Sequence, residues 1–264
     1  VKTVDNRGIM FPTVPAQGKK TEEGLDLGNT VTADVAIRKA VNMAINRQQL
    51  VDGVLGGHGV PAWGVADGLP WDNPEHRLSD GDMEGAKKLL QQAGWKLNAS
   101  GVLEKNGVEA RIPLLYFSND STRQALALAV ADMVKPLGIV FEVSGKTREE
   151  VKRLKHTSAV LYGWGQHSPI EMFNLYASSQ AGRGSYNAGF YNNAKVDAHL
   201  SAAERAGSFD ESLPHWKKAQ WDGQTGLGMK GDAPWAWLVN LDHVYFVDKC
   251  LDIGPRQLEP HGHG

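Results

Sequence analysis

The sequence predicts an α/β domain, a sheet flanked by helices and linked by right-handed crossovers. The central third of the chain alternates between short apolar runs typical of strands and segments with helical periodicity. The chain has 264 residues, 41% of them apolar and 22% charged, an ordinary globular composition. No internal repeat, low-complexity tract or linker interrupts it, so one domain is the simplest count.

The first third predicts two helices within irregular chain. Residues 1–30 carry proline and glycine without a sustained period, which indicates extended chain or loop. Residues 32–59 predict one amphipathic helix, with Asp34 as its N-cap and glycines as its stop. Residues 61–79 are irregular, and residues 80–95 predict a second helix that starts near Asp80.

The middle of the chain predicts the core of the sheet. "ARIPLLYF" (110–117), "IVFEVS" (139–144) and "SAVLYGW" (158–164) are strand-like, and a helical segment separates each pair. This alternation favours strands joined by right-handed crossovers. Beyond a loop up to Asn193, the sequence predicts two helices and then two apolar strands, "PWAWLVNL" (234–241) and "HVYFVD" (243–248).

Composition excludes several classes of function. Lys plus Arg number 28 and Asp plus Glu 30, a net charge of −2, so nucleic acid and anionic membranes are poor partners. The longest nearly apolar stretch, Ala125 to Val134, is about half the length that spans a bilayer. The single Cys250 rules out an internal disulfide and a zinc site built on several thiolates.

Motifs of catalysis are absent from the sequence. It has no phosphate-binding glycine loop, no nucleophile elbow and no H-E-x-x-H motif. His261 and His263 are most simply part of a solvated tail. We therefore expect no catalytic residue, no metal and no cofactor.

A binding wall is predicted where two strands end. In open α/β sheets, ligands bind outside the carboxyl ends of the strands. Glycines on both sides of Trp164 allow close backbone approach, so the indole can lie flat against a ligand. The predicted ligand-binding residues here are Trp164, Gly165, Gln166 and His167, with Phe117, Ser118 and Asn119 after the neighbouring strand.

Several stretches, taken in order, resemble the extracellular solute-binding proteins of bacterial ABC importers, of the oligopeptide, dipeptide and nickel type. They cover nearly everything after about residue 30: "VAIRKAVNMAINRQQLVDGVLGGHGVPA" (35–62), "DMEGAKKLLQQAGW" (82–95), "SGVLEKNGV" (100–108), "STRQALALAVADMVKPLGIVFEV" (121–143), "LYGWG" (161–165), "YNNAKVDAHLSAAERAGSFDE" (191–211) and "DAPWAWLV" (232–239).

The resemblance implies the carboxy-terminal lobe of a two-lobed, type II-like periplasmic-binding-protein fold, with a mixed sheet flanked by helices. Residues 31–264 would form this single ligand-binding lobe, residues 1–30 an extended crossover segment, and the N-terminal lobe would be absent. The function implied is binding of a small solute (a peptide, an opine-like molecule or a metal chelate) and its delivery to an ABC permease. The implied location is the periplasm, or the cell surface as a lipoprotein in a single-membrane bacterium.

The ligand class and two rival functions stay open. Peptide-binding members typically carry an aspartate soon after the "GW" strand end, whereas this chain has no acid before Glu171; Arg183 and Tyr186 favour an anionic or chelate-like ligand. One rival is a secreted metal-dependent hydrolase using His58, His167 and Asp67. The other is a structural or protein-interaction domain, for which the wall near Trp164 should be flat.

Overall fold

The computed structural model describes residues 1–165, 167–252 and 254. Its strands form a six-stranded sheet in the order β2-β9-β1-β8-β6-β7 and a small sheet in the order β3-β4-β5. The strands are β1 (Lys2–Met10), β2 (Gly59–Pro61), β3 (Lys96–Leu97), β4 (Leu103–Lys105), β5 (Val108–Glu109), β6 (Arg111–Phe117), β7 (Val140–Lys146), β8 (Ala159–Trp164) and β9 (Trp235–Asp242). The helices are α1 (Thr30–Ala33), α2 (Val35–Ala44), α3 (Arg47–Val54), α4 (Met83–Gln92), α5 (Ser121–Val134), α6 (Arg148–Leu154), α7 (Ile170–Tyr176), α8 (Ala194–Glu204) and α9 (Phe209–Gln220).

The predicted alternation of strands and helices in the middle of the chain is confirmed. Strands β6, β7 and β8 run parallel, with α5 and α6 as the crossovers between them. Strand β8 also pairs antiparallel with β1, which in turn pairs antiparallel with β9, so the sheet is mixed. This mixed arrangement places β8 between a parallel and an antiparallel neighbour.

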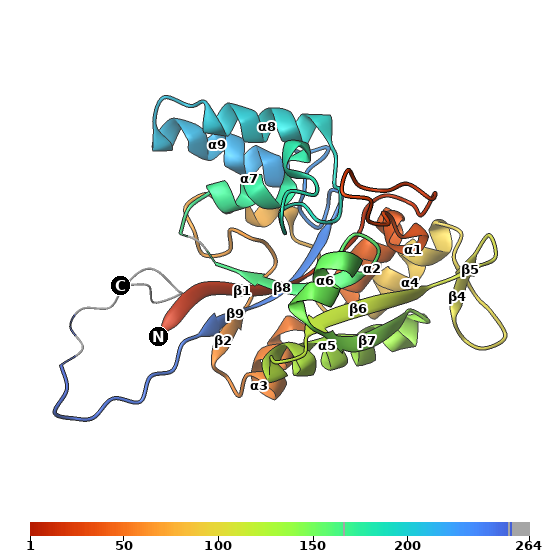
Figure 1. The fold of residues 1–264 in the computed structure, drawn as a ribbon, viewed down its shortest axis with the longest axis horizontal. Helices are drawn as coiled ribbons and strands as arrows, with labels where there is room; N and C mark the ends of the chain where they lie inside the picture. The colour runs from red at the N-terminus through yellow and green to blue at the C-terminus, as the bar shows by residue number, and fades with distance from the viewer. Residues whose placement is uncertain (166, 253, 255–264) are drawn as a thin grey trace.

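Each face of the large sheet buries its own apolar cluster. Side chains alternate along β8: Leu161 belongs to the cluster packed under α2, α3 and α5, and Tyr162 to the cluster under α7, α8 and α9. The same alternation places Leu238 and Trp237 of β9 on opposite faces. Figure 1 shows α7, α8 and α9 grouped above the sheet and α5 below it. Strands buried on both faces explain why their sequences are continuously apolar.

The N-terminal segment enters the sheet. Residues 1–30 were expected to be extended chain or loop, and Lys2–Met10 is instead strand β1, between β9 and β8. Within this segment the polar residues come first and the apolar residues last, so the alternation that is typical of a strand is not visible in the sequence. Burial rises along β1, and Ile9 and Met10 are buried in the apolar clusters on opposite faces of the sheet.

The prediction of one helix over residues 32–59 is wrong. The chain leaves the helix at Ile45 and begins a new one after Asn46, whose side chain accepts a hydrogen bond from the Gln49 amide at 3.0 Å. Asp34 does cap α2, as predicted, by accepting from the Ala36 amide at 2.9 Å. Asn46 is thus a second N-cap inside the apolar pattern, and it divides the segment into α2 and α3.

Three further expectations differ from the structure. The cap of α4 is Asp82, which accepts from the Gly85 amide at 2.8 Å, whereas Asp80 pairs with Arg47 of α3. Residues 243–248 were predicted to be a strand and have no strand structure, and Phe246 is 99% exposed. Apolar composition alone does not make a strand where no neighbouring strand lies alongside. The loop predicted up to Asn193 contains α7.

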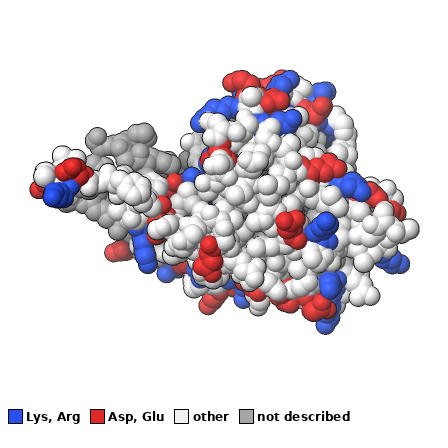
Figure 2. All heavy atoms as spheres, turned by 90° about the horizontal axis from the view of Figure 1, so that it is seen from below, with Lys and Arg blue, Asp and Glu red and all other residues white. Residues whose placement is uncertain are grey.

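The surface agrees with a near-neutral chain. On the face drawn in Figure 2, acidic and basic side chains are interspersed among broad uncharged areas, without one continuous basic patch among the residues described there. In the part of the chain that the structure describes, no helix has the length and apolarity that crossing a membrane requires.

Candidate functional site

The carboxyl ends of β6 and β8 meet at one edge of the sheet, as predicted. The two strands are parallel neighbours, with Leu115 opposite Val160. Two residues further along each strand, the ring of Phe117 lies 5.9 Å from the ring of Tyr162. The two strand ends therefore form one aromatic surface.

Trp164 extends this aromatic surface. Its ring centroid lies 6.4 Å from that of Tyr162 and 5.6 Å from that of Tyr186, at 33° to the Tyr186 plane. The side chain is half-buried and packs against the cluster under α7, α8 and α9. The indole Nε1 is buried and has no hydrogen-bond partner among the described residues. Trp164 is thus partly supported by its own chain and partly open at the sheet edge.

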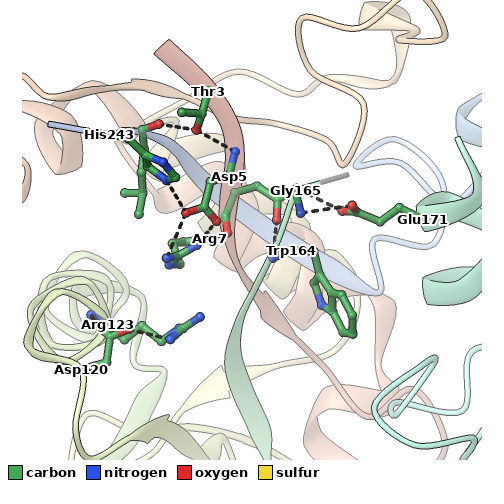
Figure 3. A network of polar contacts seen from close by, with 11 residues as sticks. Thr3, Asp5, Arg7, Asp120, Arg123, Trp164, Gly165, Glu171 and His243 are labelled. Atoms are coloured by element: carbon green, nitrogen blue, oxygen red, sulfur yellow. Dashed lines mark hydrogen bonds and ion pairs between the residues drawn. The ribbon is translucent and has the colours of Figure 1, made fainter. Parts of the chain in front are cut away.

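The chain turns sharply after Trp164, and three polar contacts hold the turn (Figure 3). Asn6 of β1 accepts a hydrogen bond from the Trp164 amide at 2.9 Å, and Glu171 of α7 accepts from the Gly165 amide at 3.1 Å. Asn6 in turn donates to Glu171 at 3.3 Å. Gly165 has φ +145°, and a Cβ there would come within 2.6 Å of the Asp5 backbone, so this position requires glycine.

A groove opens beside Phe117, between α6, the end of β8 and the loop before α8. Its volume is about 280 Å³. It is lined by Phe117, Arg148, Glu149, Val151, Lys152, Lys155, Tyr162, Gly184 and Ser185. We call it the β6–β8 groove. A concave site of this kind argues against the flat wall expected for a protein-docking surface.

The groove carries more cationic than anionic side chains. Arg148 lies over the Phe117 ring at 5.6 Å, and Lys155 donates a hydrogen bond to the Gly184 carbonyl. Lys155 is buried, and this burial lowers the pKa of its ammonium group. The groove therefore has an aromatic floor with positive charge along one side.

The predicted site residues are distributed unevenly around this groove. Phe117 lines it, and the tilted ring pair of Trp164 and Tyr186 lies beside it. Ser118, Asn119, His167 and Arg183 are exposed, and Gln166 lies outside the described residues. Sequence reasoning missed the other eight lining residues, among them Tyr162, Arg148 and Lys152. The cationic pair Arg148 and Lys152, one turn apart on a short helix after a strand end, was the available signal.

The three residues of the hydrolase alternative do not come together. Within the described chain, the group able to hold a metal is a different one, Asp67, Asp72 and His76, whose ligand atoms all lie within 4.8 Å of one another. The guanidinium of Arg77 already occupies that cluster, 3.3 Å from Asp67 and 2.7 Å from Asp72. Neither His58 nor His167 belongs to it. The structure gives the hydrolase alternative no support.

Burial shifts the pKa values of Asp67 and His76, two groups of that cluster, in the directions that favour their neutral forms. Burial raises the pKa of Asp67 from 3.8 to about 7, although the Trp63 amide and Arg77 act in the opposite direction. Burial, aided by Arg77, lowers the pKa of His76 from 6.5 to about 3.

These two shifts predict opposing effects of pH on stability. Between about pH 4 and 6.5, the unfolded chain has ionised Asp67 and protonated His76, whereas the folded chain keeps both neutral. As pH rises, the free energy of unfolding therefore falls through Asp67 and rises through His76, each by at most about 1.4 kcal/mol per pH unit. The two contributions largely offset each other in the natural sequence.

Single substitutions should expose each contribution. As pH rises from 4.5 to 6.5, the unfolding free energy of Asp67→Asn is expected to increase by about 2 kcal/mol relative to that of the natural sequence. The unfolding free energy of His76→Gln is expected to decrease by a similar amount over the same range. Urea unfolding at several pH values measures this difference. The double variant serves as the control and should run parallel to the natural sequence. Parallel curves for the single variants would contradict the assignment.

Comparison with known proteins identifies the family. A model of the bacterial extracellular solute-binding proteins, family 5 (middle region), matches residues 16–186, more than half of the chain. The chain belongs to this family. The resemblance inferred from the sequence is thereby confirmed, and the family is one of binding proteins, not of enzymes.

Two curated relatives show how much of a longer protein this chain spans. Protein XP55 of Streptomyces lividans is 33% identical over 87% of this chain and 42% of its own length. The oligopeptide-binding protein AppA of Bacillus subtilis is 26% identical over 74% of this chain and 41% of its own length. The chain thus spans less than half the length of these curated relatives.

A solved structure confirms the fold class. NikZ of Campylobacter jejuni, in complex with Ni(L-His), superimposes with a TM-score of 0.76 over 91% of this chain and 45% of NikZ, at 23% sequence identity. At that identity the likeness concerns the fold alone. It agrees with an α/β lobe built on a mixed sheet.

Proposed function

We propose that this chain is the solute-binding lobe of an ABC importer receptor, which binds a small solute and delivers it to a membrane permease. The observation that carries the proposal is the β6–β8 groove beside an aromatic wall, at the shared carboxyl edge of two parallel strands in a family 5 chain. A second lobe would close over this edge and make the liganded shape that a permease recognises. In this role the chain binds and breaks no bond.

The aromatic wall consists of Phe117, Trp164 and Tyr186, and its rings stack on the flat or apolar part of the solute. The exposed polar side chains around it hydrogen-bond the rest of the solute: Ser118, Asn119, His167 and Arg183, with Gln166 and the Gly165 backbone completing the set. The solute is a peptide, an opine-like molecule or a metal chelate. AppA is named an oligopeptide-binding protein and NikZ holds Ni(L-His), which supports this range.

The proposed location follows from the family. Its members are described as extracellular solute-binding proteins, and we place this one in the periplasm, or on the surface of a single-membrane bacterium as a lipoprotein.

Native mass spectrometry of protein purified without refolding tests the proposal. We expect a bound small molecule that is released on denaturation and that rebinds with 1:1 stoichiometry to protein freed of ligand. Rebinding should quench the fluorescence of Trp164 because the solute covers its ring. Turnover of the released molecule by the protein, in place of simple rebinding, would contradict the proposal.

A further inference from the structure

Two arginines far apart in the chain lie together over Gly163, the residue before Trp164. Arg7 of β1 is opposite Gly163 across the antiparallel pair, and Arg123 is in the first turn of α5. A Cβ on Gly163 would lie 2.5 Å from Arg7 Nη1 and 2.7 Å from Arg123 Nη2, so these nitrogens are no more than about 5 Å apart. The absence of a side chain at Gly163 lets both guanidinium groups approach the strand.

Neighbouring acceptors satisfy part of the donor set of each arginine, and Arg7 also donates to the Asn6 carbonyl at 2.8 Å. Asp5 lies 2.5 Å from Arg7, and Asp120 lies 2.5 Å from Arg123 (Figure 3). Asp5 is also in contact with His243 at 3.0 Å, so its negative charge is shared. The Nε atoms of both arginines are buried and have no partner among the described residues. Each guanidinium has five N–H donors and no acceptor.

The two cations repel each other, and Asp5 and Asp120 offset this repulsion. Burial lowers the pKa of Arg123, and the next largest cause is the neighbouring charge of Arg7, ahead of either carboxylate. The side chains of Arg7 and Arg123 are 12% and 17% exposed, so a small anion can reach the pair from solvent. A pair of forked guanidinium groups is suited to a group with several oxygen atoms.

The arginine pair adjoins the proposed binding site. Gly163 is covalently next to Trp164, and the Arg123 guanidinium lies 5.4 Å from the Phe117 ring, on which Arg148 also lies. Gly163 and Trp164 face opposite sides of β8, so the pair adjoins the wall at Phe117, and a solute that extends past the Phe117 ring meets it there. We propose that Arg7 and Arg123 bind an oxyanion group of the solute, a carboxylate or a phosphoryl group, and so select for acidic solutes. This rests on the proposed function.

The test observes the arginine Nε–H groups directly by two-dimensional ¹H–¹⁵N NMR. Sodium acetate and sodium phosphate are titrated at constant ionic strength, with sodium chloride as the reference salt. We expect the Nε–H signals of Arg7 and Arg123, assigned with Arg7→Gln and Arg123→Gln, to shift saturably with a dissociation constant on the order of 10 mM. Whether acetate or phosphate binds more tightly identifies the oxyanion.

Gly163→Ala provides a variant that keeps both charges. Its methyl group displaces the two guanidinium groups, so oxyanion binding should weaken by about tenfold or more. Gly53→Ala is the matched control because a methyl group there meets no atom within 4 Å, and it should bind as the natural sequence does. If Gly163→Ala fails to fold, Arg123→Gln must abolish the shift of the Arg7 signal.

The outcomes separate this inference from the proposed function. Shifts that do not saturate, or that occur equally with chloride, overturn the arginine site even where a solute still co-purifies with the protein. Saturable shifts that Gly163→Ala and Arg123→Gln leave unchanged overturn it as well. Loss of the co-purified solute alone bears on the proposed function and leaves the oxyanion result standing.

Discussion

Replacing Arg47 with alanine is expected to lower the free energy of unfolding by about 3–5 kcal/mol, because it removes one member of a buried charged network. Arg47 is fully buried. Its Nε donates to the carbonyl oxygens of Ala62 and Trp237, both at 2.8 Å, and its Nη2 donates to the Asn42 side chain at 2.9 Å. Its Nη1 pairs with Asp80. One side chain thus joins α2, the segment after β2, and β9.

Urea unfolding at neutral pH measures this loss. Arg47→Met, which preserves length and apolar contact, should remain strongly destabilised because the carbonyl groups and Asp80 lose their donor. The exposed Arg205→Ala is the control and should change the unfolding free energy by less than about 0.5 kcal/mol. A loss below about 1 kcal/mol for Arg47→Ala would contradict the role assigned to this network.

Replacing Trp164 with alanine is expected to reduce solute affinity by about tenfold to a hundredfold, since a stacked aromatic ring contributes roughly 1.5–3 kcal/mol of contact. The ring lies against Tyr186 and stands next to the β6–β8 groove, so its removal takes away part of the wall. Trp164→Phe keeps an aromatic surface and should retain most of the affinity. Calorimetric titration of the released solute into protein freed of ligand measures the change.

Two controls separate binding from stability in that experiment. Phe209→Ala removes a half-exposed aromatic ring from α9 and should leave solute affinity unchanged. The unfolding free energy of each variant is measured alongside, because Trp164 also packs against the cluster under α7, α8 and α9. Unchanged affinity in Trp164→Ala, with the protein still folded, would remove Trp164 from the proposed wall.

Local patterns predicted the central elements of the fold well. The strands β6, β7 and β8 and the helices between them each carry a clear period, and each was predicted close to its observed position. The predictions failed where a neighbour, and not the local pattern, decided the outcome. Strand β1 exists because β8 and β9 flank it, whereas residues 243–248 have a higher apolar content and form no strand.

The candidate site was predicted in part. Trp164 and Phe117 were expected at one sheet edge, and parallel pairing of β6 and β8 brings their strand ends together. The contact of Tyr186 with Trp164 depends on the path of a loop, for which the sequence shows no period. The position of Arg148 beside Phe117 depends on the angle at which α6 leaves β7, and that angle is set by packing of the helix on the sheet.

By itself, the sequence determined the kinds and order of the central elements, from β6 to β8, and the placing of aromatic and small polar residues just after two strands. These are local properties, because side-chain alternation and capping act within a few residues of chain. Only the tertiary structure decided which distant residues meet: Arg7 with Arg123 over Gly163, and Arg47 with the carbonyl of Trp237. Such contacts depend on strand order and register, which arise when the whole sheet assembles and which no short segment specifies.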